Sequence, residues 1–144
     1  MSSATLYLDA NILFSLAYFS EGAIPELVDE AAAKHHKLVT SVYAVDEARR
    51  NISQRYPERL ARLDSYLKIV SLAPEPTTEL LEEAVGYGLP AKDAPILAAA
   101  IGATCDYLVT GDKRHFGRLY GRVVRGVRVL APRDMLELLL KDDL

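Results

Sequence analysis

Four acidic residues have the types and positions that metal-dependent phosphate chemistry requires: Asp9, Glu47, Asp93 and Asp112. Asp9 directly follows one short apolar run, and Asp112 follows another after a Thr-Gly pair. A carboxylate is costly to bury without a partner. Several carboxylates aimed at one place therefore indicate a hard divalent cation, because such ions prefer oxygen ligands. A site of this kind is suited to chemistry on phosphate groups.

Three of these residues have a second interpretation. Asp93 precedes the apolar run at residues 94–101, which predicts a buried helix, so it is either a metal ligand or a cap stabilised by the helix dipole. Asp9 and Asp112 follow predicted strands, where ligands bind in open α/β sheets. An Asp at such a position also caps a following helix well. The residues alone leave both interpretations open.

The acidic pair Asp46-Glu47 is the least decided. Both residues fall off the apolar stripe formed by Val42, Val45 and Ile52, so helical spacing does not choose between them. A solvated Glu47 paired with a basic residue three positions later remains the simpler interpretation on spacing alone.

Short apolar runs alternate with longer helical patterns, which is typical of a parallel α/β sheet. We expect strands at residues 5–8, 37–40, 69–72, 107–109 and 127–130. We expect helices at residues 12–19, 24–34, 42–54, 57–66, 77–87, 94–102 and 132–140. Near-continuous apolar strands fit a sheet covered on both faces. Neighbouring positions for the first and fourth strands would bring Asp9 and Asp112 together.

Length and composition predict one globular domain over residues 1–144, since half of the residues are apolar and about a quarter are charged. The apolar run at residues 4–19 is interrupted by Asp9 and Asn11, and no basic residue precedes it. We therefore predict no export signal and no membrane span. The lone Cys105 permits no internal disulfide and is expected in the core. These features favour the cytoplasm.

The formal net charge of −3 argues against broad electrostatic adhesion to nucleic acid. Basic residues are nevertheless concentrated between Lys113 and Arg133, where no acidic residue occurs. This run is either a solvated surface or an edge that contacts phosphates beside an acidic centre. The adjacent His35 and His36 fit a loop or a helix end better than a metal site.

Four short segments, taken in order, form the most specific pattern in the chain. They are Leu8-Asp9-Ala10-Asn11-Ile12-Leu13, Ser41 with Glu47 six positions later, Asp93-Ala94-Pro95-Ile96-Leu97-Ala98-Ala99-Ala100, and Leu108-Val109-Thr110-Gly111-Asp112. Together they resemble the PIN-domain ribonucleases, including the VapC-like toxins, and cover nearly the whole chain. One departure is Asp46, because the family more often has an apolar or small residue before its Glu.

The resemblance implies a three-layer α/β/α sandwich with a five-stranded parallel sheet and an Mg²⁺- or Mn²⁺-dependent endoribonuclease. By position, the acidic site would consist of Asp9, Glu47, Asp93 and, as a variable fourth member, Asp112. The polar residues Asn11 and Thr110 match positions that often support such a site. Many relatives of this size are toxins of toxin–antitoxin pairs and form homodimers, so the resemblance also implies an antitoxin partner.

A divalent cation would remove the repulsion between these carboxylates. The expected ligands are Asp9, Asp93 and Asp112. We expect Asp9 and one of the other two to bind the ion directly, and the third to act through water. The ion would lower the pKa of a bound water, which Glu47 would orient for attack on the phosphate. The basic residues near these motifs that would hold the RNA backbone are Arg50, Lys92, Lys113 and Arg114.

Other classes of protein remain as alternatives. A catalytically silent PIN-fold binding module is one, although the presence of all four acidic residues argues against it. A metal-dependent phosphatase or phosphotransferase of the haloacid-dehalogenase type usually needs a second Asp where this chain has Asn11. A receiver domain would need an acidic pair that is missing. The helix at residues 132–140 has more apolar surface than one buried face needs, as core or as a dimer or antitoxin contact.

Overall fold

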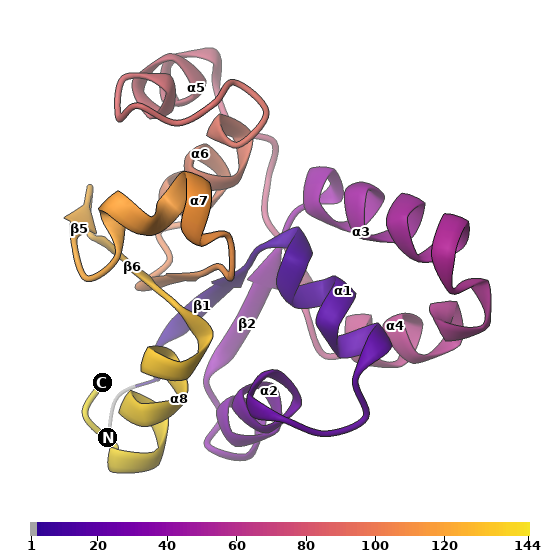
Figure 1. The fold of residues 1–144 in the computed structure, drawn as a ribbon. Coiled ribbons are helices and arrows are strands. Elements are labelled where there is room, and N and C mark those ends of the chain that lie inside the picture. Colours follow the sequence, from indigo (N-terminus) through magenta and orange to yellow (C-terminus); the bar gives the residue numbers. More distant parts are fainter. Residues whose placement is uncertain (1–2) are drawn as a thin grey trace.

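Six short strands form one sheet in the computed structural model, which describes residues 3–144 (Figure 1). The strands are β1 (Thr5–Leu8), β2 (Lys37–Thr40), β3 (Ser71–Leu72), β4 (Tyr107–Val109), β5 (Val123–Val124) and β6 (Val127–Leu130). Their order across the sheet is β3-β2-β1-β4-β6-β5. All neighbouring pairs are parallel except β5 with β6.

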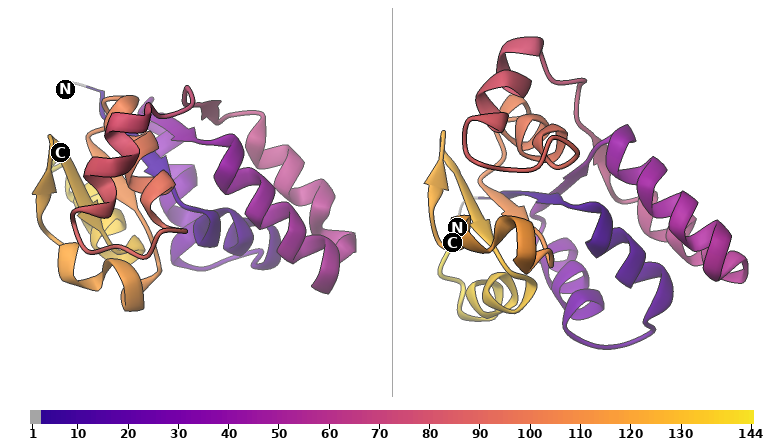
Figure 2. Two further views of the ribbon diagram at one scale, coloured as in Figure 1. Left: turned by 90° about the horizontal axis from the view of Figure 1, so that it is seen from above. Right: turned by 45° about the horizontal axis from the view of Figure 1, so that its top comes forward.

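Helices cover the sheet on both sides. They are α1 (Ala10–Tyr18), α2 (Ala23–Ala33), α3 (Val42–Arg55), α4 (Leu60–Leu67), α5 (Thr78–Val85), α6 (Ala94–Gly102), α7 (Lys113–Phe116) and α8 (Pro132–Lys141), with 3₁₀ turns at Pro57–Arg59 and Gly117–Leu119. The pair α5–α6 packs on one side of the sheet and the pair α2–α8 on the other (Figure 1). Helices α3 and α4 lie side by side against α1 (Figure 2). No helix within the described residues is long and apolar enough to cross a bilayer.

The predicted α/β/α sandwich is confirmed, and β1, β2, β4 and β6 have the predicted bounds. The strand expected at residues 69–72 is shorter, because the N–H groups of Ile69 and Val70 bond to carbonyls in the last turn of α4. Those two residues therefore cannot pair with β2. Burial of Cys105, which is 2% exposed, agrees with its expected place in the core.

The sheet has one strand more than the five expected, and this strand, β5, is antiparallel. It is joined to β6 by Arg125 and Gly126, which have φ angles of 52° and 87°. Consecutive positive φ angles are typical of the tight turns that connect hairpins, and glycine adopts them without strain. Arg125-Gly126, with valines on either side, is a sequence pattern typical of a hairpin, and it was overlooked in the prediction.

The register of the central strands positions the residues that follow them. Leu8 lies opposite Val109 in the parallel pair of β1 and β4. The pairing extends one step further, because the N–H of Asp9 donates to the carbonyl of Val109 at 3.1 Å. Asp9 and Thr110 therefore leave the sheet side by side. Helix α1 begins at Ala10, two residues earlier than predicted, because Asp9 caps it.

The predicted N-cap of α3, Ser41, also ties the helix to the sheet. Its hydroxyl accepts from the N–H of Ala44 at 3.1 Å and pairs with the hydroxyl of Tyr7 at 2.6 Å. Both side chains are buried, so neither hydroxyl can exchange its partner for bulk water. One residue thus fixes the start of α3 against β1, and with it the position of Glu47.

We expect Ser41→Ala to lower the free energy of unfolding by about 1–3 kcal/mol, because it removes a cap and leaves the buried Tyr7 hydroxyl without a partner. Thr77→Ala is the matched control, since Thr77 caps α5 through Leu80 N–H but is exposed. It should cost about 1 kcal/mol or less. Urea unfolding of both variants measures the difference. Equal costs would contradict a role for the Tyr7 contact.

Candidate active site

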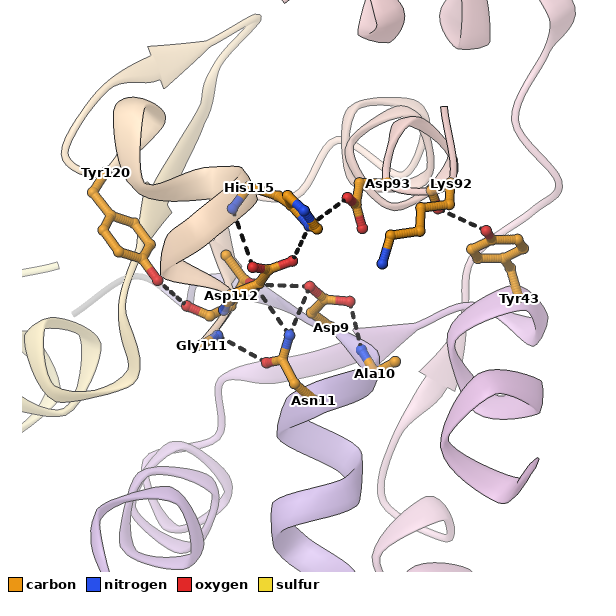
Figure 3. A network of polar contacts seen from close by, with 11 residues as sticks. Asp9, Ala10, Asn11, Tyr43, Lys92, Asp93, Gly111, Asp112, His115 and Tyr120 are labelled. Atoms are coloured by element: carbon orange, nitrogen blue, oxygen red, sulfur yellow. Dashed lines mark hydrogen bonds and ion pairs between the residues drawn. The ribbon is translucent and has the colours of Figure 1, made fainter. Parts of the chain in front are cut away.

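Three of the four acidic residues, Asp9, Asp93 and Asp112, gather at the carboxyl edge of the sheet, each brought there by a different element (Figure 3). Asp9 follows β1 and caps α1, and Asp112 follows β4 and caps α7. Asp93 occupies the N-cap position of α6. β1 and β4 are neighbours in the sheet, a condition that the sequence left open, so the two strand-end aspartates leave the sheet at one place.

Asp9 is 4% exposed and uses both carboxylate oxygens as hydrogen-bond acceptors. Oδ1 accepts from the N–H of Ala10 at 2.6 Å. Oδ2 accepts from the Thr110 hydroxyl at 2.8 Å and from the Asn11 amide at 3.1 Å. Burial raises the pKa of Asp9 to about 6 even though the bonds from Thr110 and Ala10 act to lower it. The metal-free site therefore opposes the ionised form of Asp9.

Thr110 and Asn11 brace this carboxylate against the end of β4. The Thr110 hydroxyl also accepts from the N–H of Asp112 at 3.1 Å, and the Asn11 carbonyl oxygen accepts from the N–H of Gly111 at 2.8 Å. A Cβ at Gly111 would lie 3.3 Å from that oxygen, so a larger residue would crowd the bond. The two expected supporting residues thus hold Asp9 and the strand end in one hydrogen-bonded unit.

Asp93 and Asp112 face each other across His115. His115 Nδ1 lies 2.8 Å from Asp112 Oδ2 and 3.0 Å from Asp93 Oδ2. The backbone N–H of His115 also donates to Asp112 Oδ1 at 3.1 Å, which fixes the first turn of α7. One oxygen or nitrogen atom of each of the three residues lies within 4.8 Å of the others. This group includes two of the predicted metal ligands and one residue that was not predicted.

Asp93 makes no capping bond through its side chain. Burial raises the pKa of its carboxyl group, and the nearby Asp112 adds to the rise, while Lys92 and His115 lower it. Its Oδ2 atom is buried and has no hydrogen-bond partner among the described residues. Asp93 thus stands at the start of α6, as a cap stabilised by the helix dipole would, but its carboxylate makes no capping bond and can serve as a ligand.

Glu47, rather than Asp46, faces the site. Asp46 is exposed, whereas Glu47 is partly buried and lines a hollow of about 200 Å³ together with Asn11. The charge of Glu47 acts to raise the pKa of Asp9, which places the two carboxylates near each other. Packing of α3 against α1 produces this orientation.

The four basic residues expected to hold a phosphate backbone are differently placed. Lys92 extends its ammonium group toward the carboxylates (Figure 3), in keeping with its effect on the Asp93 pKa. Arg50 is exposed on α3, and its charge acts to lower the pKa of Tyr43. Lys113 and Arg114 are exposed on α7, next to Asp112.

The basic run that ends at Arg133 does not form a single free edge. Arg118 donates to the carbonyl of Gly88 at 3.3 Å, and Arg125 forms an ion pair with Glu83. These two residues serve contacts with the α5 region. Of the two interpretations left open for the basic run, neither describes these two side chains fully, because each also makes a contact within the protein.

His115 is the site residue that sequence reasoning missed. Its position three residues after Asp112 puts both on one face if a helix starts there, but α7 has only four residues and no apolar periodicity. The contact with Asp93 depends on α6 and α7 lying across from each other, and a local sequence pattern cannot predict that arrangement.

The residues present fit a divalent cation. Asp9, Asp93 and Asp112 offer carboxylate oxygens, and the buried Asp93 Oδ2 lacks a hydrogen-bond partner among residues 3–144. A bound cation would remove the burial penalty that raises the pKa values of Asp9 and Asp93.

Residues 5–114, well over half of the chain, match the family model described as the PIN domain. The fold is similar to PAE2754 from Pyrobaculum aerophilum, with 18% identity, a TM-score of 0.67, and 97% of this chain and 99% of that chain covered. It is also similar to VapBC2 from Rickettsia felis bound to a DNA fragment from their promoter (17% identity, TM-score 0.65, 88% and 98% covered). The fold is also similar to FitAcB from Neisseria gonorrhoeae, with 16% identity, a TM-score of 0.61, and 88% of this chain and 97% of that chain covered. No curated protein matches the sequence.

Proposed function

The chain belongs to the PIN-domain family, and from this premise we propose that it is a divalent-metal-dependent endoribonuclease that hydrolyses phosphodiester bonds of RNA. The observation that carries the proposal is the close approach of Asp93 and Asp112, with a carboxylate oxygen of each lying within 4.8 Å of the other. They meet at the edge of the sheet where Asp9 follows β1. The cofactor is Mg²⁺ or Mn²⁺, because both ions accept carboxylate and water ligands.

In this proposal Asp9, Asp93 and Asp112 hold the ion, which supplies a bound water of lowered pKa and neutralises charge on the phosphate. Thr110 keeps Asp9 Oδ2 aimed at the centre through its 2.8 Å hydrogen bond. Glu47 orients the attacking water and accepts its proton from the side of α3. Lys92 reaches the same centre from the turn that precedes α6 and positions the scissile phosphate.

The flanking RNA backbone is assigned to basic side chains on both sides of the acidic residues. Arg50 lies on α3, while Lys113 and Arg114 lie on α7. Their charges would offset the repulsion between RNA and the carboxylates, and binding would weaken as salt rises.

Cleavage of a panel of structured and single-stranded RNAs tests the activity. We expect site-specific products with Mn²⁺ or Mg²⁺ and none with EDTA. Activity that persists in EDTA would overturn the metal-dependent mechanism, and metal-dependent cleavage of DNA but not RNA would overturn the substrate assignment.

The neighbouring acids Asp46 and Glu47 provide a matched pair of variants. We expect Glu47→Gln to lower kcat by about 10²-fold or more, because the amide cannot take a proton from the attacking water. Asp46→Asn should cleave at nearly the wild-type rate, since Asp46 is exposed and points away from the hollow beside Asn11. Single-turnover cleavage of the same RNA measures both. A larger loss in Asp46→Asn would reverse the assignment.

The biological role that fits this activity is the toxin of a toxin–antitoxin pair, acting on RNA in the cytoplasm, with an antitoxin partner and a homodimeric state. The similarity in fold to VapBC2 and FitAcB supports this role. Induced expression should arrest growth, and co-expression of a small protein from an adjacent reading frame should relieve the arrest. Light scattering of the purified protein tests the dimer.

A further inference from the structure

His115 brings a nitrogen donor into a centre that is otherwise built from oxygen. Its Nδ1 atom faces both Asp93 and Asp112, at 3.0 and 2.8 Å (Figure 3). The backbone of His115 is fixed on both sides of the ring. Its N–H bonds to Asp112 Oδ1, and the next residue, Phe116, is fully buried.

A single ring nitrogen cannot satisfy both carboxylates. Nδ1 carries at most one proton, and it forms a hydrogen bond with Asp112 Oδ2. Asp93 Oδ2 is close to the same nitrogen but is not in hydrogen-bond geometry with it. Asp93 is only 9% exposed, so this oxygen has little access to bulk water. Asp93 Oδ2 thus has no hydrogen-bond donor of its own among the described residues, and a cation is a group that all three atoms could share.

The spacing of the three donors fits such a group. Adjacent ligands of an octahedral Mg²⁺ or Mn²⁺ ion bound at about 2.1 Å lie about 3.0 Å apart. The two distances from Nδ1 to the carboxylate oxygens are close to that value, and all three donor atoms lie within 4.8 Å of one another.

We propose that His115 Nδ1 is a metal ligand beside Asp93 and Asp112, and that this nitrogen makes the centre prefer Mn²⁺ to Mg²⁺. The inference rests on the metal site of the proposed function and adds to it a ligand and an ion preference. Mg²⁺ is a hard ion that favours oxygen and keeps its waters. Mn²⁺ also binds oxygen ligands, but as a transition-metal ion it accepts a nitrogen ligand more readily than Mg²⁺ does.

Pulsed electron paramagnetic resonance of bound Mn²⁺ tests the ligand directly, because a coordinated imidazole gives hyperfine coupling from its nitrogen. We expect this coupling in the wild-type protein and its loss in His115→Gln. The chain has three histidines, so His35→Asn is the matched control. His35 is exposed at the end of α2 with φ of 62°, a conformation that Asn tolerates. This control should keep the coupling.

Calorimetric titration with Mn²⁺ and with Mg²⁺ tests the preference. His115→Gln should lower the affinity for Mn²⁺ by about 10- to 100-fold, a loss typical of substitutions around metal ligands. The affinity for Mg²⁺ should change much less. His115→Asp, which restores a ligand but makes it oxygen, should raise the affinity for Mg²⁺ above that of the wild type and reverse the preference. Circular dichroism confirms folding, and the wild-type spectrum alone decides the ligand if a variant does not fold.

The outcomes separate this inference from the proposed function. Wild-type protein that binds Mn²⁺ without nitrogen coupling, or an unchanged Mn²⁺ to Mg²⁺ ratio in His115→Gln, would overturn the role of His115 and leave the carboxylate site standing. Wild-type protein that binds neither ion would overturn both.

Discussion

We expect the Asp9→Asn protein to fold and to lose RNA cleavage by more than about 100-fold. Substitutions of groups that only surround metal ligands already cost 10- to 100-fold in affinity or activity, and Asp9 is assigned to the ion itself. The amide also breaks the local hydrogen-bond pattern. Asp9 accepts through both oxygens, from Ala10 on one side and from Asn11 and Thr110 on the other. An Asn there must turn its NH₂ group toward one of these donors.

The stability of this variant should change little, because two effects oppose each other. The mismatched donor costs about 1–3 kcal/mol. Loss of a buried charge whose pKa is raised to about 6 contributes a similar amount in the stabilising direction at neutral pH. A folded but inactive protein separates a chemical role from a structural one.

Asp106→Asn is the control for this prediction. Asp106 precedes β4 and its Oδ2 accepts from the N–H of Thr5 at 2.8 Å, so it links the same two strands at the opposite edge of the sheet. One accepting oxygen is enough there, and an Asn provides it. Cleavage at the wild-type rate is expected from Asp106→Asn. Full metal-dependent cleavage by Asp9→Asn would refute the assigned mechanism.

The second large effect concerns stability in the absence of metal. In EDTA, Asp9 should lower the free energy of unfolding by about 3 kcal/mol in total as pH rises from well below 4 to well above 6. The unfolded carboxyl group titrates near 3.8 and the folded one near 6, so between these values the folded state binds more protons. The contribution of Asp9 is therefore most favourable below pH 4 and is lost as pH passes 6. The raised pKa of Asp93 acts in the same direction.

Urea unfolding of wild type and Asp9→Asn at pH 4.5 and 7.5 isolates this effect, because the difference between the two proteins cancels the other titrating groups. At pH 7.5, Mn²⁺ should stabilise the wild type by about 2.7 kcal/mol when present at 100 times its dissociation constant. Stabilisation should be smaller at pH 4.5, where protons compete for the carboxylates. A pH-independent difference in EDTA would show that Asp9 is ionised without penalty.

The strands and the placement of two aspartates could be predicted because their causes are local. Apolar runs that end at Asp9 or Thr110 mark both the strand and its carboxyl end. The neighbouring positions of β1 and β4 could not be derived from such runs, because strand order depends on contacts between segments that are far apart in the sequence. β3 was overestimated because Ile69 and Val70 look like strand residues while their N–H groups close a helix.

The orientation of α3 shows why Glu47 was undecided. The larger residues Val42, Val45 and Ile52 predicted the buried stripe, but the helix buries Ala44, Ala48 and Ile52. Small residues allow α3 to pack closely on α1, and Val42 is left 46% exposed. Reasoning from the sequence put most weight on the large apolar side chains, whereas the contact between α3 and α1 depends on small ones. Rotation of the stripe toward the alanines is what turns Glu47 to the site.

The place of β1 between β2 and β4 has a consequence for how the protein is made. β2 follows β1 within about thirty residues of synthesis, whereas β4 begins at Tyr107. A nascent chain that stops before that point has one open edge on β1 and lacks Asp112 and His115 altogether. Incomplete translation products thus carry no assembled centre. A cell that translates this message is therefore exposed to the assembled centre only after most of the chain has left the ribosome.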